Sequence, residues 1–119
     1  MIVLVTGGRG YIGDIDDAMN LFHRTNPITL LIHGDARGVD RRCAAWANRL
    51  GIHSPGVPAL WDTFKLGAGP KRNSAMLLLK PQYLIAFPGG SGTADMTEKA
   101  ERAGIPVYTP YPLTNEAAS

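Results

Sequence analysis

Three glycine-rich segments carry the residues best suited to chemistry, and each follows a run of aliphatic residues. They span residues 7–13, 33–40 and 88–93. Glycine allows the main chain to approach a ligand closely, and the first amides of a following helix point at an anion without partners inside the helix. The carboxyl ends of parallel strands share the sheet edge where ligands bind. We therefore predict that these segments together bind phosphate.

The segment Pro88-Gly89-Gly90-Ser91-Gly92-Thr93 is the most specific of the three. It combines an approachable main chain, two hydroxyls and the start of a helix, which together can give several hydrogen bonds to one phosphate. The alternative is a tight turn in which Thr93 caps the helix, although a cap alone does not require three glycines. The Lys-Ser/Thr ending of a Walker A loop is missing.

The first segment contains Gly8-Arg9-Gly10-Tyr11-Ile12-Gly13, which superficially matches the G-x-G-x-x-G fingerprint of dinucleotide binding. That fingerprint also places an acidic ribose ligand about 20 residues further on, and Asp35 is the nearby candidate. Asp35 lies in a second glycine-rich segment, and we expect no separate substrate domain. An ordinary dehydrogenase is therefore not expected.

Two groups of polar residues, one in the second glycine-rich segment and one after Pro70, each have two interpretations. Arg37 and Asp40 either pair with each other or contact the ligand. Lys71, Arg72 and Asn73 begin a predicted helix, where positive charge is unfavourable unless an anion binds beside it. The alternative for these three residues is a solvated, basic helix end.

The composition excludes several classes of protein. The chain has 119 residues, 45% of them hydrophobic, and its net charge of +2 is scattered, so we expect one core and no strong nonspecific nucleic-acid binding. Cys43 is predicted to be a buried, inert thiol and His33 a structural histidine. His23 and His53 lack metal-ligand spacing with Cys43, so we expect neither a metal site nor a bound cofactor.

The amino-terminal aliphatic run is far shorter than the ~20 residues of a membrane span, and no basic region precedes it. We therefore expect neither an anchor nor a signal peptide, and we predict a cytoplasmic protein.

Runs typical of doubly buried strands alternate with segments whose apolar residues recur at helical spacing. Strands are predicted at 2–5, 28–32, 83–87 and 105–108, with an irregular or edge element at 52–57. Helices are predicted at about 14–25, from the second glycine-rich segment to 50, at 71–79, and from the third segment to about 103. A loop is predicted at 59–70. Trp46, Trp61 and Phe64 are expected in the core, and the alternative for them is a place in an interface between two copies of the chain.

This order predicts an α/β fold: a single Rossmann-like three-layer domain with a mostly parallel sheet. We expect the domain to span residues 1–109 and a flexible tail to span residues 110–119.

Four stretches together resemble the YspA-type, cpYpsA-related branch of the SLOG superfamily: Val5 to Arg9, His33 to Asp40, Gly69 to Asn73 and Pro88 to Met96. The resemblance extends over nearly the whole chain. Relatives in that superfamily include the LOG-type cytokinin-activating phosphoribohydrolases and the DNA-processing protein DprA. The resemblance implies a Rossmann-like fold, a groove for a nucleotide or nucleic acid, and a homodimer.

The phosphoribohydrolases carry an Arg with a Met four positions later, and Arg72 with Met76 has that spacing. They also carry P-G-G-x-G-T-x-x-E, whose Glu works with the Arg in splitting the N-glycosidic bond. Met96 stands at the position of that Glu. Asp95 and Glu98 are close in sequence but do not share its direction on a helix, so the hydrolase pattern is broken.

Three hypotheses follow. The first is a sensor, carrier or sequestering protein for a small nucleotide, with an adenine nucleotide or an ADP-ribose-like ligand favoured. Its binding residues would be Gly8, Arg9, Gly10, Asp35, Arg37, Asp40, Lys71, Arg72, Asn73, Gly89, Gly90, Ser91, Gly92 and Thr93.

The second hypothesis is a nucleotide N-glycosidase in which Arg72 orients the sugar phosphate and Asp95 or Glu98 replaces the missing carboxylate. The third, with nucleic acid as the less favoured partner, is single-stranded DNA binding in the manner of DprA. It would use as phosphate contacts Arg9, Arg37, Lys71 and Arg72. Such binding would weaken steeply with salt.

Overall fold

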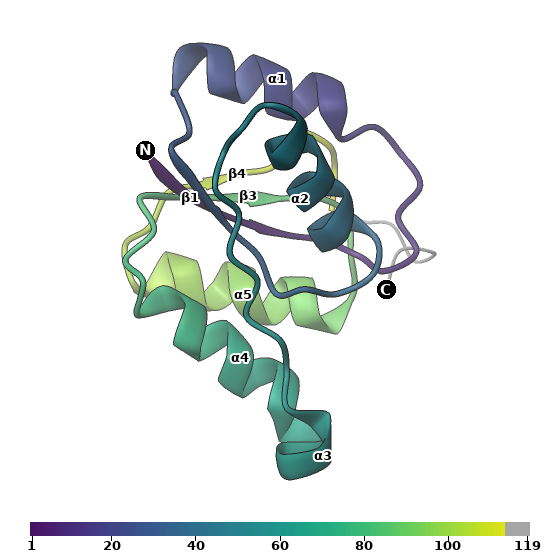
Figure 1. Cartoon of the computed structure of the whole chain (residues 1–119). Coiled ribbons are helices and arrows are strands. Elements are labelled where there is room, and N and C mark those ends of the chain that lie inside the picture. The colour runs from purple at the N-terminus through teal and green to yellow at the C-terminus, as the bar shows by residue number, and fades with distance from the viewer. Residues whose placement is uncertain (114–119) are drawn as a thin grey trace.

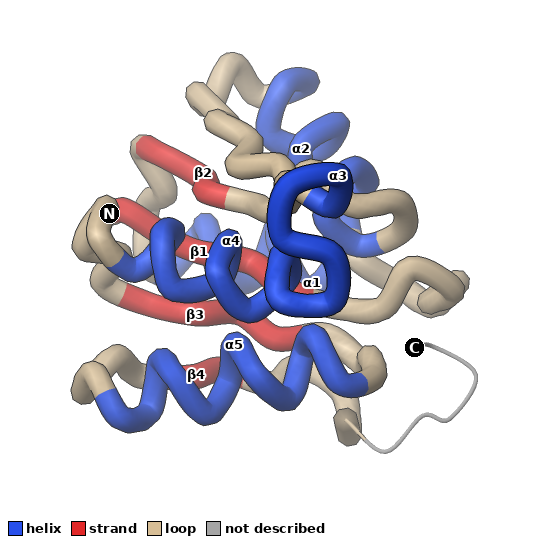
Figure 2. The backbone as a smooth tube through the Cα atoms, turned by 90° about the horizontal axis from the view of Figure 1, so that it is seen from below, coloured by secondary structure: helices blue, strands red, loops and turns tan. Residues whose placement is uncertain are grey.

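The computed structural model describes residues 1–113, and a four-stranded sheet runs through its centre (Figure 1). The strands are β1 (Ile2–Thr6), β2 (Leu30–Ile32), β3 (Tyr83–Ala86) and β4 (Val107–Tyr108). Their order across the sheet is β2-β1-β3-β4 (Figure 2). Every neighbouring pair is parallel. The central strands are aliphatic runs because helices cover both of their faces.

Helices form the outer layers: α1 (Asp16–Thr25), α2 (Val39–Arg49), the short α3 (Trp61–Phe64), the 3-10 turn η1 (Lys65–Gly67), α4 (Ala68–Leu77) and α5 (Ser91–Arg102). Figure 1 shows α1 and α2 on one face of the sheet and α4 and α5 on the other. The predicted three-layer, Rossmann-like α/β domain is therefore confirmed. Among residues 1–113, no helix is long and apolar enough to cross a membrane.

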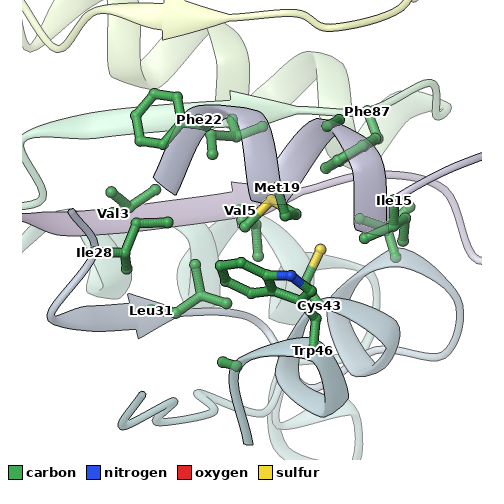
Figure 3. Close-up of a cluster of buried hydrophobic side chains, with 14 of the residues drawn as sticks. Val3, Val5, Ile15, Met19, Phe22, Ile28, Leu31, Cys43, Trp46 and Phe87 are labelled. Carbon is green, nitrogen blue, oxygen red and sulfur yellow. The ribbon is translucent and has the colours of Figure 1, made fainter. Parts of the chain in front are cut away.

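Alternate residues of β1 enter two separate cores. Val3 and Val5 pack with α1 and α2, as the close-up of that cluster shows (Figure 3), whereas Leu4 packs with Met76 and Met96 on the other face. Both clusters are essentially closed to solvent. Successive strand residues point to opposite faces, so a strand buried on both sides reads as an unbroken apolar run.

The strand order reverses between β1 and β3, and this reversal opens a crevice at their carboxyl ends. The chain passes from β1 outward to β2 and then returns to β3 on the other side of β1. The loops after β1 and β3 meet there, where the Gly8 amide donates to the Pro88 carbonyl at 2.8 Å. A Cβ on Gly89 would lie 2.8 Å from the Gly8 nitrogen, so only glycine allows this approach.

The segment 52–57 runs beside the free edge of β2 as single bridges rather than a strand. Leu30 pairs with His53, and His33 pairs with Gly56. The Leu31 amide donates to the His53 carbonyl at 2.9 Å. The irregular edge element predicted here is confirmed.

The loop predicted at 59–70 is wrong, because α3, η1 and the first turn of α4 occupy most of it. The α3 turn projects from the body of the molecule (Figure 1), and none of its residues is buried. Trp61 and Phe64 are 44% and 40% exposed, so their predicted place in the core is also wrong, whereas Trp46 is buried. A helical turn that buries no face does not repeat apolar residues at helical spacing, so the sequence pattern gave no sign of this helix.

Tyr111 ties the end of the described chain to the start of α1. Its hydroxyl donates to Asp14 Oδ2 at 2.6 Å, and Asp14 also accepts the amides of Asp17 and Ala18 at 3.0 and 3.1 Å. Burial acts to raise the pKa of Asp14, but these three hydrogen bonds outweigh it and lower that pKa. Residues 114–119, the rest of the predicted tail, lie outside the described residues.

Replacing Tyr111 with Phe should lower the free energy of unfolding most below pH 10. The hydrogen bond to Asp14 raises the pKa of Tyr111 from 10.0 to about 12. Its contribution is therefore complete below the unfolded-state pKa and is lost as the pH rises through the folded-state pKa. Urea unfolding across this alkaline range measures the difference from the native chain.

The matched control for that measurement is Tyr108→Phe, because Tyr108 stacks on Phe22 and its hydroxyl donates no hydrogen bond within residues 1–113. A Tyr111→Phe difference that stays constant from pH 10 to 12 would contradict the contact.

Candidate functional site

A cavity of about 460 Å³ lies at the crevice between the carboxyl ends of β1 and β3. Segments far apart in the sequence contribute to its wall. The lining residues are Val5, Thr6, Gly7, Gly8, Arg9, Ala36, Asp40, Trp61, Leu66, Gly69, Pro70, Arg72, Asn73, Met76, Gly90, Ser91, Gly92, Thr93 and Asp95. Its position is the one at which open parallel sheets bind ligands.

The amino terminus of α5 opens into this cavity. Gly90 precedes the helix and provides no side-chain cap, and Thr93 lies inside the first turn rather than at the cap. The amides of Ser91, Gly92 and Thr93 therefore have no carbonyl partner within the helix. These amides and the positive end of the helix dipole favour an anion in the cavity.

Arg72 reaches from α4 to the loop after β2. Its Nη1 donates to the Gly34 carbonyl at 2.9 Å, and its Nε donates to Asn73 Oδ1 at 3.1 Å. A Cβ on Gly34 would lie 2.8 Å from Nη1, so glycine at this position makes room for the guanidinium.

The charge of Arg72 has no carboxylate in salt-bridge distance within residues 1–113. Burial lowers the pKa of Arg72, and the positive charge of Arg9 lowers it further, while Asp40 and Asp95 act in the opposite direction. Two neighbouring guanidiniums in a half-buried site favour the binding of an anion.

Asp40 is the buried support of the loop that receives Arg72. Its Oδ2 accepts the amides of Gly34 and Ala36 at 3.1 and 3.2 Å, and the residue is only 6% exposed. Burial raises the pKa of Asp40, although the two amides and the charge on Arg72 oppose that shift. Asp40 stands in the first turn of α2, where it holds the Gly34 carbonyl toward Arg72.

Asn73 connects α4 to the start of α5. Its Nδ2 donates to the Gly92 carbonyl at 3.2 Å and to Asp95 Oδ2 at 2.9 Å. Lys99 donates to the same Asp95 oxygen at 2.9 Å. Asp95 therefore borders the cavity with one oxygen already held by two donors.

The other two positions that the hydrolase pattern singles out on α5 lie away from the cavity. Met96 is fully buried in the core beneath α5. Glu98 is exposed and pairs with Arg102 one helical turn later. Of these neighbouring positions, Asp95 is the one at the cavity.

The structure brings most of the predicted binding residues together, but not all of them. Asp35 and Arg37 border a neighbouring hollow, and Asp35 pairs with Arg41 at 3.4 Å instead of Arg37 pairing with Asp40. Gly89 does not line the cavity, and it lies close to Thr93 and Gly8. Gly10 and Lys71 are exposed outside the cavity, and Lys71 Nζ lies 5.0 Å from the centre of the Phe64 ring.

Sequence reasoning missed Trp61 and Leu66, which line the cavity from α3 and η1. The Arg9 guanidinium lies 5.6 Å from the centre of the Trp61 ring, a cation–π arrangement. Trp61 precedes Gly69 and Pro70 in the sequence. Its segment has no regular spacing of apolar residues, so the sequence did not predict where its side chain lies.

The G-x-G-x-x-G match does not form a dinucleotide site. The helix after it begins only at Asp16, and the Asp14 carboxylate already occupies the first amides of that helix. A pyrophosphate would compete with this carboxylate for the same amides.

His33 is buried directly after β2, and both of its ring nitrogens make hydrogen bonds to the main chain. Its Nδ1 accepts the Asp35 amide at 3.0 Å, so its Nε2 carries the proton and donates to the Ser54 carbonyl at 3.3 Å. A wide, open hollow of about 770 Å³ lies beside it, along the outer edge of β2 and away from the glycine-rich loops after β1 and β3.

Comparison with known proteins decides the family. Residues 1–64 match the family model described as YspA, cpYpsA-related SLOG family. The chain belongs to this SLOG family. A relative, the Gene 61 protein of Mycobacterium phage D29, is 33% identical over 117 residues, covering 88% of this chain and 92% of the relative.

Membership of the SLOG family indicates a nucleotide-related ligand at a coarse level. The family match covers the loops after β1 and β2 and ends before α4 and α5. The family match therefore does not extend to the cavity residues Arg72, Asn73 and Asp95.

The buried acceptor in this site can be tested by replacing Asp40 with Ala. Two main-chain amides then lose their acceptor, which should lower the free energy of unfolding by roughly 2–4 kcal/mol. Asp40→Asn keeps an oxygen at this position and should cost clearly less. Urea unfolding measures both variants, and equal losses would contradict the role of the shared oxygen.

Proposed function

We propose that this SLOG protein binds a nucleotide in the cavity between β1 and β3. The observation that carries the proposal is that Arg72, which has no carboxylate partner among residues 1–113, lines the same cavity as the uncapped amino terminus of α5. The phosphate is bound there by the amides of Ser91 to Thr93 and by the guanidinium.

The remainder of the cavity suits a nucleoside. Trp61, Leu66 and Met76 give one part of the wall an apolar surface, while Asn73 and Asp95 supply polar groups. About 460 Å³ is within the range of small-ligand pockets. The base binds against the exposed face of Trp61, and the ribose lies between the base and α5.

The favoured ligand is an adenine nucleotide or an ADP-ribose-like molecule, bound by a sensor, carrier or sequestering protein. Calorimetric titration with AMP, ADP, ADP-ribose and NAD tests this, followed by chromatography of the recovered ligand. Saturable binding of intact ligand is the expected result. An absence of binding to all four would contradict the proposal, and single-stranded DNA would then be titrated at several salt concentrations.

Arg72→Ala should weaken AMP binding about 10- to 100-fold, because a charge-assisted contact to the phosphate is lost. Arg72→Lys keeps the charge but loses the planar fork, and we expect an intermediate affinity. Calorimetry measures both variants after circular dichroism has shown that the fold is intact.

Arg24→Ala is the matched control, because Arg24 is an exposed cation in α1, on the opposite face of the sheet. Equal AMP affinity in the Arg72→Ala and Arg24→Ala variants would exclude Arg72 from the phosphate site.

A second candidate function, a nucleotide N-glycosidase, rests on the position of Asp95 at the cavity wall. Asn73 and Lys99 hold one carboxylate oxygen, which fixes the orientation of the group. In this reaction water adds to C1′ of the ribose, the N-glycosidic bond breaks, and the base leaves with a proton. The carboxylate would stabilise the positive charge that develops on the sugar.

Chromatography of free base tests this candidate with two isosteric variants. Asp95→Asn should abolish base release while leaving AMP bound, because only the charge on the carboxylate is removed. Glu98→Gln is the matched control and should turn over normally, since Glu98 pairs with Arg102 outside the cavity. Base release that survives Asp95→Asn would remove Asp95 from the mechanism.

A further inference from the structure

A second hollow, of about 370 Å³, opens beside the nucleotide cavity. The two share Arg9, Ala36, Trp61 and Arg72 as lining residues. The other residues of the second hollow come from the loop after β2, from α2 and from the segment before α3: Gly34, Asp35, Arg37, Arg41, Pro58 and Ala59. The cavity and the hollow are therefore adjoining parts of one larger depression.

The second hollow is strongly cationic. Arg9, Arg37, Arg41 and Arg72 border it, against the single carboxylate of Asp35. Asp35 is already paired with Arg41, at 3.4 Å. Arg37 forms no salt bridge within residues 1–113 and is exposed.

Asp40 does not border the second hollow, although its charge acts on Arg72. It is buried, and its Oδ2 is engaged by the Gly34 and Ala36 amides behind the loop. Clustered cations in a concave surface attract and bind an anion, since the low-dielectric wall concentrates their field.

We propose that the second hollow binds a second anionic group of the same ligand. The ligand class is then a nucleotide with two phosphate groups at separate positions, such as a nucleoside 3′,5′- or 2′,5′-bisphosphate. One phosphate lies on the amino terminus of α5, and the other lies between Arg37 and Arg41. This inference rests on the proposed function, because the first phosphate must occupy the first cavity.

Trp61 and Arg72 stand where the two parts meet, which is where the nucleoside between two such phosphates would lie. The Arg72 Nη1 is directed to the Gly34 carbonyl on the wall of the second hollow, and Arg9 lies over the Trp61 ring. A ligand with adjacent phosphates, such as ADP, extends its charge in one direction only and would leave the second hollow empty.

Calorimetric titration of the full chain with AMP, ADP and adenosine 3′,5′- and 2′,5′-bisphosphates tests the assignment. We expect at least one bisphosphate to bind about tenfold or more tightly than AMP, and ADP to show no such gain. The gain should shrink as salt is raised, because the four arginines are partly exposed.

Arg37→Ala combined with Arg41→Ala should remove the gain of the bisphosphate and leave the affinity for AMP within about twofold. Arg37→Ala alone keeps the Asp35–Arg41 ion pair. A smaller bisphosphate gain in this single variant therefore does not come from the loss of that ion pair. Arg24→Ala combined with Arg49→Ala changes the net charge equally, in α1 and at the end of α2, and should retain the gain.

The outcomes separate the two proposals. AMP that binds with no gain from either bisphosphate overturns the second phosphate site and leaves the proposed function standing. A gain that survives in the Arg37 and Arg41 variant also overturns the assignment to this hollow. If neither AMP nor a bisphosphate binds, the proposed function fails and this inference fails with it.

Discussion

The site depends on one chain of hydrogen bonds that begins at the buried Asp40 carboxylate. Asp40 fixes the loop after β2, the carbonyl of Gly34 in that loop accepts Arg72, and Arg72 donates to Asn73, which donates to Asp95. The chain thereby links α2, on one face of the sheet, to α4 and α5 on the other. A buried polar network is stable only when every member has its partner, so the positions of these residues are set together.

Much of the fold could be predicted because its signals are local. The runs at 2–5 and 83–87 are doubly buried, and their continuous apolar character indicates parallel strands without further information. The start of β2 shows the limit of this reasoning. The strand was predicted from residue 28, and Ile28 is buried, but β2 begins at Leu30. A run of apolar residues indicates which side chains are buried and does not indicate which main-chain groups pair.

The glycine-rich loops of the site were predictable for the same reason, whereas the roles of individual side chains were not. Asp40 and Asp35 are close in sequence, but one turns inward to main-chain amides and the other pairs with Arg41. Trp61 stands on a helical turn that buries nothing, so no periodicity marked it. Such roles depend on which way a side chain points, and sequence spacing alone does not give this.

The two edges of the sheet determine whether a strand from another copy of the chain can pair with it. On the β2 side, single bridges from 52–57 cover the edge, and Pro55 and Pro58 interrupt the row of main-chain amides in and after this segment. On the other side, β4 is two residues long and lies between Pro106 and Pro110. Both edges are thus poor templates for strand addition, which protects the fold from edge-to-edge aggregation.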